Sequence, residues 1–261
     1  MTFDFFDVTV LRKELLSPSA VRLVFGGADL AAFASGGRDQ RFKLFLPRPH
    51  QRVAVVPRGE DWYPQWRAAD PATRAVMRTY TVREQRGGEF DVDFAVHDTV
   101  SAGPASTWAR HARPGDRAVV LAPTVADNGG VDFRPPPDTD WVLLTGDESA
   151  LPALAGILAW VGRSMPVRAW IEVHDAADVR DLPRPQGAEL TWLVGGGVLD
   201  AVRAADLPPG TPYAWVAGES GVVRSVRRHL VHERGIDRRR VMFTGYWRRG
   251  ATEDDLIAEA A

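Results

Sequence analysis

The chain has 261 residues, 45% hydrophobic and 25% charged, a composition typical of a soluble globular protein. Its net charge of −2 at pH 7 excludes a protein that binds nucleic acid through its overall charge. It has no cysteine, which excludes disulfides, zinc–thiolate sites, iron–sulfur clusters and dithiol redox chemistry.

The N-terminal sequence has no basic stretch followed by an apolar stretch, so we expect no signal peptide and a cytoplasmic protein. The longest mostly apolar stretch runs from residue 150 to residue 162 and contains Pro152. Because this stretch is too short to cross a bilayer, we expect no membrane insertion.

The first half of the chain consists of short segments with the alternating pattern of β-strands. Turn residues such as Gly87 and Gly88 separate these segments. The expected strands cover residues 5–12, 20–25, 41–46, 78–84, 89–97 and 116–122. Short strands at this spacing predict an all-β N-terminal domain, an antiparallel six-stranded β-barrel over residues 1–125.

Residues 126–139 are rich in glycine, proline and polar residues, and we interpret them as a linker. Apolar segments then alternate with helical patterns in residues 140–261. The expected strands are 141–145, 167–173, 190–194, 213–217 and 241–246, and the longer expected helices are 149–163 and 221–234. This alternation predicts a C-terminal α/β domain with a Rossmann-like parallel sheet, followed by a tail.

A first candidate site lies on the fourth expected strand. On a strand, Arg78 and Tyr80 share one face, and Thr79 and Thr81 share the other. An arginine can hold a phosphate through two hydrogen bonds, a tyrosine can stack on a flat heterocycle, and a threonine can bond to a ring edge. The alternative is an ordinary barrel strand with an exposed arginine.

A second candidate site combines His97 with the segment Gly103, Pro104, Ala105 and Ser106, which has the sequence of a helix start. The free N–H groups of a helix N-terminus could hold a pyrophosphate, and Ser106 could add a donor. The alternatives are an ordinary helix that begins at a proline and a structural histidine.

A third candidate site consists of two similar turns that follow apolar strands. The turns contain Gly146, Asp147, Glu148 and Ser149 in one case and Gly218, Glu219 and Ser220 in the other. Open α/β sheets bind nucleotides at the carboxyl ends of strands, so both turns are candidate nucleotide contacts. Neither matches the glycine-rich dinucleotide fingerprint, and two turns without function are the alternative.

A fourth candidate site follows the last expected strand. Trp247 could cover a flat cofactor, and Arg248 and Arg249 could attract an anionic substrate. A packed edge with solvated arginines is the alternative. His174 and Asp175 lack further ligands at a known spacing, so we expect no metal site.

In this order, the four clusters resemble the siderophore-interacting protein family, which comprises FAD-dependent ferric-siderophore reductases of the ferredoxin-reductase superfamily. The matching segments are MRTYTVR, GPASTWA, RPGD, DWVLLTGDESALPA, WVAGESGVVRSVRRHL and TGYWRRG. The resemblance covers nearly the whole chain.

The resemblance implies an FAD site and no catalytic side chain, because the flavin carries the redox chemistry. Arg78 would hold an FAD phosphate, Tyr80 would stack on the flavin ring with Thr79 and Thr81 beside it, and Trp247 would cover the cofactor. His97 and residues 103–106 would hold the rest of the FAD.

The resemblance also implies an electron donor and an acceptor. The turns at 146–149 and 218–220 would bind NADH or NADPH, and Lys43, Arg248 and Arg249 would attract an anionic ferric siderophore. Electrons would pass from NAD(P)H through FAD to Fe(III), and hard oxygen chelators would release the Fe(II) product.

Two segments depart from the family pattern. Residues 122–125 lack an expected basic residue, and residues 193–195 lack an expected histidine or arginine. Arg163, Arg168 and Arg180 are candidates for binding the 2′-phosphate of NADPH, and a ferredoxin is an alternative donor. A general flavin- or ferredoxin-type reductase that serves a protein partner and a non-enzymatic siderophore-binding module remain as other functions.

Overall fold

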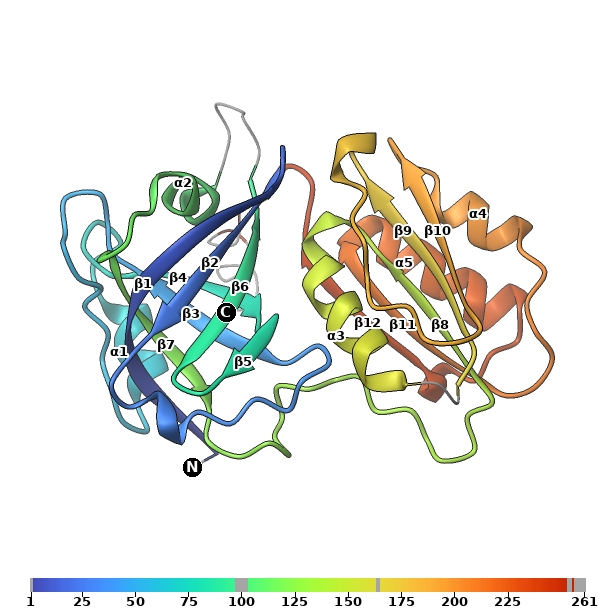
Figure 1. The fold of residues 1–261 in the computed structure, drawn as a ribbon, viewed down its shortest axis with the longest axis horizontal. Coiled ribbons are helices and arrows are strands. Elements are labelled where there is room, and N and C mark those ends of the chain that lie inside the picture. Colours follow the sequence, from blue (N-terminus) through green and yellow to red (C-terminus); the bar gives the residue numbers. More distant parts are fainter. Residues whose placement is uncertain (1, 97–102, 163–164, 253–254, 256–261) are drawn as a thin grey trace. The chain divides into compact units, whose positions relative to one another are not determined.

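The computed structural model describes residues 2–96, 103–162, 165–252 and 255 (Figure 1). The chain divides into two compact units, Met1–Val131 and Asp132–Ala261. Each unit is built on its own sheet, so each is described by itself.

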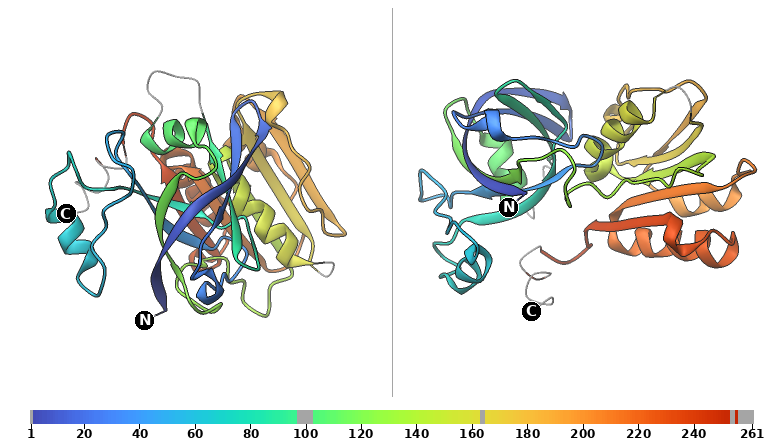
Figure 2. Two further views of the ribbon diagram at one scale, coloured as in Figure 1. Left: turned by 60° about the vertical axis from the view of Figure 1, so that its left-hand side comes forward. Right: turned by 90° about the horizontal axis from the view of Figure 1, so that it is seen from below.

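The first unit contains a seven-stranded antiparallel sheet with the strand order β4-β3-β7-β1-β2-β6-β5. The sheet curves strongly on itself, as the end-on view in Figure 2 shows. The strands are β1 (Phe3–Ser17), β2 (Ala20–Gly26), β3 (Arg41–Leu46), β4 (Val76–Thr81), β5 (Glu84–Arg86), β6 (Glu89–Ala95) and β7 (Arg117–Pro123). The connections carry the helices η1 (Leu30–Ala32), α1 (Trp62–Ala68) and α2 (Pro104–His111).

The alternating pattern of β1 shows why this sheet forms. Phe6, Val8 and Val10 are buried in the core, while Asp7 and Leu11 between and beyond them lie exposed. One face of each strand therefore removes apolar surface from water, and the other face stays solvated.

The expected six-stranded barrel is matched only in part, because the expected strand 78–84 is two strands. β4 pairs with β3, whereas β5 pairs with β6 at the opposite edge of the sheet. Between them, the Val82 N–H donates to the Gln40 carbonyl and the Arg83 N–H donates to the Asp91 carbonyl. The chain thus leaves one edge and joins the other within two residues, which no local pattern reveals.

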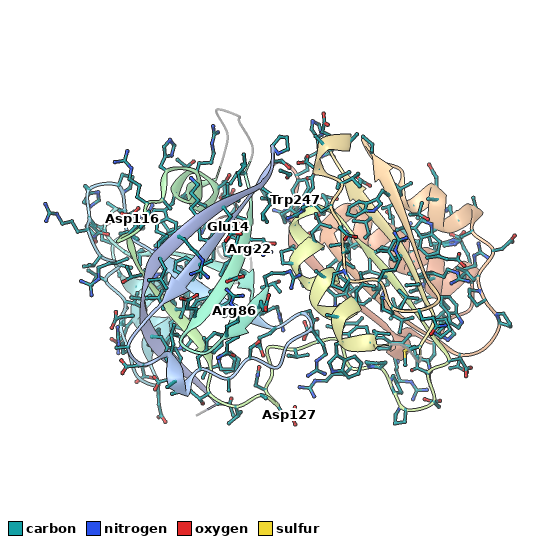
Figure 3. All side chains as sticks on the ribbon, viewed as in Figure 1. Glu14, Arg22, Arg86, Asp116, Asp127 and Trp247 are labelled. Carbon is teal, nitrogen blue, oxygen red and sulfur yellow. The ribbon has the colours of Figure 1, made fainter. Side chains whose placement is uncertain are left out.

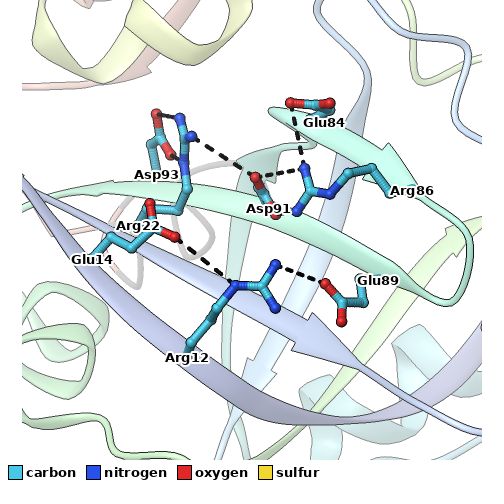
Figure 4. A network of polar contacts seen from close by, with 8 residues as sticks. All are labelled: Arg12, Glu14, Arg22, Glu84, Arg86, Glu89, Asp91 and Asp93. Carbon is cyan, nitrogen blue, oxygen red and sulfur yellow. Dashed lines mark hydrogen bonds and ion pairs between the residues drawn. The ribbon is translucent and has the colours of Figure 1, made fainter.

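A network of ion pairs covers the polar side of β1, β2, β5 and β6 (Figure 4). Asp91 and Asp93 form its centre, since only 4% and 6% of their side-chain surface is exposed. Arg22 donates to Asp93 at 2.7 Å, and Arg86 donates to Asp91 at 2.9 Å. The outer members are Arg12, Glu14, Glu84 and Glu89. Each buried carboxylate therefore has a guanidinium partner.

The second unit contains a five-stranded parallel sheet with the strand order β10-β9-β8-β11-β12. The strands are β8 (Trp141–Gly146), β9 (Val167–Val173), β10 (Ala188–Val194), β11 (Pro212–Glu219) and β12 (Val241–Trp247). The helices are η2 (Glu148–Ala150), α3 (Leu151–Val161), η3 (Ala176–Asp178), α4 (Val198–Ala204), α5 (Ser220–Arg228), η4 (His229–Glu233) and η5 (Arg238–Arg240).

Helices cover both faces of this sheet (Figure 1). On one face, Leu154 and Ile157 of α3 pack against Leu144 and its neighbours. On the other face, Val202 of α4 and Val226 of α5 join a second core. The strand order reverses direction between β8 and β11, and such a switch point is where open α/β sheets bind ligands.

Two expected helices are shorter than predicted. The helix expected at 149–163 begins at Leu151, after the turn η2. The helix expected at 221–234 ends at Arg228 and continues as the π-helical turn η4. There the Arg234 N–H bonds to the His229 carbonyl, and the ring of His229 lies 2.8 Å from Glu233.

The expected linker at 126–139 spans the boundary between the units. Its first part packs on the first unit, because the buried side chains of Asn128 and Gln40 exchange hydrogen bonds of 2.8 and 3.0 Å. Asn128 Oδ1 also accepts the Gly130 N–H at 2.7 Å.

Candidate functional site

The edge strand β4 carries the first group of candidate residues. β4 is at the end of the sheet order, and β3 is its one paired neighbour among the described strands. Arg78 and Tyr80 share the face that points toward the core, where the Tyr80 ring lies 4.5 Å from the Phe94 ring. Arg78 is buried, and its Nη1 donates to the Met77 carbonyl at 2.7 Å. A guanidinium and a phenol ring therefore lie along one edge of the sheet.

Lys43 and Thr79 lie on the other face of the same strand pair. They are direct cross-strand neighbours, and Lys43 Nζ donates to Thr79 Oγ1 at 2.8 Å. Thr81, two residues further, is buried. The structure thus brings together two residues that the sequence assigned to separate roles.

Helix α2 provides a potential anion site at its first turn. Gly103 is the N-cap and Pro104 the first helical residue, and the N-cap makes no side-chain hydrogen bond to this turn within the described part of the chain. Ser106 Oγ is buried and has no hydrogen-bond partner within the described structure. A buried hydroxyl without a partner costs free energy, so this oxygen fits a ligand that bonds to it. His97 lies outside the described residues.

In the second unit, Asp147 connects the carboxyl ends of three strands. It follows β8, and its Oδ1 accepts the Ser149 N–H at 2.9 Å and the Ser149 hydroxyl. Its Oδ2 accepts the Glu219 N–H of β11 and the Trp247 Nε1–H of β12, each at 2.8 Å. The carboxylate therefore fixes both candidate turns and the terminal indole.

Glu219 likewise accepts several backbone hydrogen bonds at the start of α5. Its carboxylate accepts the N–H groups of Gly221 at 2.6 Å, Val222 at 3.0 Å and Arg249 at 3.2 Å. Partial burial acts to raise the pKa of Glu219, but these three N–H groups outweigh it, so its pKa lies below the usual value. This side chain is therefore anionic at neutral pH.

Gly218 is required by the close approach of β11 to Asp147. Its φ is +131°, and a Cβ at this position would lie 2.5 Å from Asp147 Oδ2. Any larger residue would displace the carboxylate. A glycine at position 218 therefore lets the backbone of this turn approach the Asp147 carboxylate closely.

The remaining candidate nucleotide-binding residues of the second unit form hydrogen bonds or ion pairs with different partners. Glu148 accepts the His174 N–H, and Ser220 Oγ donates to the Trp247 carbonyl at 2.9 Å. Arg168 pairs with Glu189 at 2.9 Å, so a carboxylate already engages this 2′-phosphate candidate. Arg163 lies outside the described residues.

Two family models match this chain. The model described as siderophore-interacting FAD-binding domain matches residues 9–127, and the model described as siderophore-interacting protein matches residues 139–250. Ferric vibriobactin reductase ViuB of Vibrio cholerae is 30% identical over an alignment of 254 residues, which covers 94% of this chain and 89% of that protein. The chain belongs to the siderophore-interacting protein family. The predicted resemblance is thereby confirmed.

Further proteins are similar to this chain to the same degree. The NADPH-dependent ferric-chelate reductase of Escherichia coli is 32% identical, over 93% of this chain and 92% of its own length. The structure of the siderophore-interacting protein SipS of Aeromonas hydrophila matches with a TM-score of 0.82 and 30% identity, over 99% of this chain and 97% of that one. The structure of a siderophore utilization protein from T. fusca matches with a TM-score of 0.83 and 34% identity, over 97% of this chain and 95% of that one.

More distant structures share the fold alone. A flavohemoglobin from Malassezia yamatoensis gives a TM-score of 0.69 at 13% identity, and a ferredoxin reductase of carbazole 1,9a-dioxygenase gives 0.66 at 16%. This siderophore-interacting protein therefore has the ferredoxin-reductase-like fold, with an antiparallel half-barrel sheet followed by a parallel sheet.

The residues present fit the FAD that this family's first domain binds. The Ser106 hydroxyl, which no described residue bonds, and the N–H groups at the first turn of α2 suit a phosphate, and the Tyr80 ring suits a flat heterocycle. Among the described residues, no helix is long and apolar enough to cross a bilayer.

Sequence reasoning missed the joint role of Asp147 and Trp247, which it placed in two different sites. Both residues stood out in the sequence, but nothing in a linear pattern indicates that one accepts a hydrogen bond from the other. It also missed the structural role of Glu219 at the start of α5, for which an acidic residue directly before a helix is a usable signal.

Proposed function

We propose that this protein is a ferric-siderophore reductase that transfers electrons from NADH or NADPH through FAD to a ferric chelate. The observation that carries the proposal is the buried Ser106 hydroxyl at the start of α2, which has no hydrogen-bond partner among the described residues and lies within the family's FAD-binding domain. Two relatives that match over nine-tenths of this chain are named as a ferric vibriobactin reductase and a ferric-chelate reductase, which supports the choice of acceptor.

In the first unit, Arg78 and the first turn of α2, including Gly103, Pro104 and Ser106, would hold the FAD phosphates. Tyr80 would stack on the flavin ring, and Thr79 and Thr81 would lie beside the ring. Bound FAD supplies the exchange between a two-electron donor and a one-electron acceptor. The protein's task is to bind the cofactor and leave one ring face accessible.

In the second unit, the nicotinamide cofactor would bind at the carboxyl ends of β8 and β11, in the manner of a Rossmann-like sheet. These ends flank the switch point in the strand order. Because the Asp147 carboxylate already accepts hydrogen bonds from Ser149, Glu219 and Trp247, we assign it to shaping the site. The neighbouring Gly146, Glu148 and Ser220 would contact the nucleotide.

Lys43, Arg248 and Arg249 would attract the anionic ferric chelate. Hard oxygen ligands bind Fe(III) in preference to Fe(II), so reduction weakens the chelate and releases the metal. Iron is the substrate in this scheme, and the protein supplies electrostatic attraction and access to the flavin. A cytoplasmic location would give the enzyme its nicotinamide donor.

Anaerobic stopped-flow absorbance of the purified protein tests this function. We expect NADH or NADPH to bleach the flavin band, and a ferric hydroxamate or catecholate to restore it while a ferrous trap develops colour. A flavin that dithionite bleaches but neither nucleotide does would assign the donor to a partner protein. A protein that accepts no flavin would refute the proposal.

A further inference from the structure

Positive charge is concentrated near the end of the second unit. Residues 220–250 contain nine arginines and two acids, whereas the whole chain has a net charge of −2. Both acids already have partners. Glu233 Oε2 lies 2.8 Å from the ring of His229, and Asp237 accepts a hydrogen bond from the Arg239 guanidinium at 2.7 Å. The segment therefore carries an excess of positive charge that its own acids do not neutralise.

Three of these arginines share one face of α5. Arg224, Arg227 and Arg228 are three and four residues apart, a spacing that places side chains next to one another on a helix. Val223 and Val226, on the other side of the helix, are buried in the core. The three arginines form no ion pair with any described residue. Their charge is therefore available to a partner outside the chain.

Arg227 stacks on an aromatic ring of β12. Its guanidinium carbon lies 4.3 Å from the centroid of the Phe243 ring, and Phe243 is 42% exposed. Arg227 Nε is buried and has no hydrogen-bond partner within the described structure. The ring thus holds the guanidinium in place without using any of its hydrogen bonds. We call Arg224, Arg227, Arg228 and Phe243 together the α5 arginine face.

The α5 arginine face lies away from the candidate nucleotide turns. α5 begins at Ser220, at the carboxyl end of β11, and a helix rises about 1.5 Å per residue, so Arg228 is about 12 Å further along its axis. Phe243 is the third residue of β12, and Trp247 ends that strand about 13 Å away (Figure 3). The α5 arginine face is therefore a separate surface, towards the amino ends of the strands.

The composition of this surface fits a protein partner that carries carboxylates. The planar guanidinium of arginine bonds a carboxylate through two parallel hydrogen bonds, and arginines and aromatic residues are enriched in protein interfaces. Anionic lipid surfaces are bound by clusters of about four to eight basic residues, more than the three on this helix face. The net charge of −2 disfavours nucleic acid.

We propose that the α5 arginine face is a docking surface for an acidic segment of a partner protein. Carboxylates of the partner pair with Arg224, Arg227 and Arg228, and its apolar groups contact the exposed ring of Phe243. Phe243 is a positioning residue, since it orients the Arg227 guanidinium. The inference goes beyond the proposed reductase function and does not depend on it.

Fluorescence anisotropy of an oligoglutamate peptide, labelled with a red dye and titrated with the full-length protein, tests this surface. We expect Arg224→Ala combined with Arg228→Ala to weaken binding at least about tenfold, because two charge pairs are lost. Arg184→Ala is the matched control and should leave the affinity unchanged. Arg184 is exposed, forms no ion pair with any described residue and precedes β10, at the other end of the sheet order. An oligoglutamine peptide should not bind.

Two variants of Phe243 test the role of the ring and do not depend on the arginine double variant. Phe243→Leu should weaken peptide binding severalfold, because Arg227 loses its aromatic support, whereas Phe243→Tyr keeps the ring and should bind as the wild type does.

Several results would overturn this inference while leaving the flavoenzyme intact. One is a wild-type protein that does not bind the oligoglutamate peptide, and another is equal affinity in the wild type and the arginine double variant. A third is binding to phosphatidylglycerol vesicles, but not to the peptide, that the double variant loses, which would assign the surface to a membrane.

Discussion

The indole Nε1–H of Trp247 donates a 2.8 Å hydrogen bond to Oδ2 of Asp147, 100 residues earlier in the chain. The same oxygen accepts the Glu219 N–H, and the other carboxylate oxygen accepts the Ser149 N–H. One side chain therefore holds the carboxyl ends of β8, β11 and β12 in register. The orientation of Trp247 depends on a residue in a different turn.

Replacing Asp147 should destabilise the protein by disrupting this junction. In Asp147→Asn a single oxygen remains as acceptor, so two of the donors lose their partner and unfolding free energy should fall by about 1–3 kcal/mol. Urea unfolding measures the loss. Ser149→Ala, which removes one hydroxyl and leaves the bonds to Glu219 and Trp247, should cost less than about 1 kcal/mol. Equal losses for the two variants would contradict this account.

Ser106→Ala should separate flavin binding from stability. The Ser106 hydroxyl has no partner within the described structure, so its removal should change the unfolding free energy of the flavin-free protein by less than about 0.5 kcal/mol. Flavin affinity should fall about tenfold, the equivalent of one hydrogen bond. Ser225→Ala is the control, since its hydroxyl donates to the Gly221 carbonyl at 2.9 Å and should affect stability alone. A clear loss of stability in Ser106→Ala would show that the hydroxyl serves the fold.

Asp91→Ala should be among the costly substitutions in the ion-pair network (Figure 4). The Asp91 side chain is 4% exposed and lies between Arg22 and Arg86, while its hydrogen bond to Arg86 raises the pKa of that guanidinium. Because Arg86 is itself 38% exposed, we expect a loss of about 2–3 kcal/mol, somewhat less than for a fully buried pair. Glu84→Ala removes an exposed partner of Arg86 and should cost less than about 1 kcal/mol in the same guanidinium chloride unfolding. Similar losses for both variants would mean that burial of Asp91 is unimportant.

Asp237 should make stability depend on pH only in the acid range. Its hydrogen bonds to the Arg239 guanidinium and N–H lower its pKa from 3.8 to about 2. A carboxylate with a depressed folded-state pKa stabilises the protein above its unfolded pKa, and the contribution disappears as the pH falls through the folded value. The difference in Tm between wild type and Asp237→Asn should therefore be constant above about pH 5, and most of it should be lost by about pH 2. A difference that persists at pH 2 would point to a contact other than the charge.

Local sequence patterns were sufficient to predict the strands and helices that bury one continuous run of apolar residues. The strand predicted at 167–173 is β9, and the two-part architecture of strands followed by alternating strands and helices is observed. Family membership was also readable, because it depends on short motifs that keep their order along the chain. These features depend on periodicity over a few residues, which the sequence states directly.

Only the tertiary structure decided where distant segments meet. The break between β4 and β5 arises because Thr81 and Glu84 belong to strands at opposite edges of the sheet. Helix α1 has seven residues, which is too short to show a helical period in the sequence. The side chains of Arg48 and Gln51 bond to carbonyl groups more than 20 residues away and so position the segment 47–52. The Asp147–Trp247 contact is of the same kind. Side-chain hydrogen bonds between residues far apart in sequence leave no local pattern. The local sequence therefore determines the helices and strands, whereas the packing of these elements determines the site.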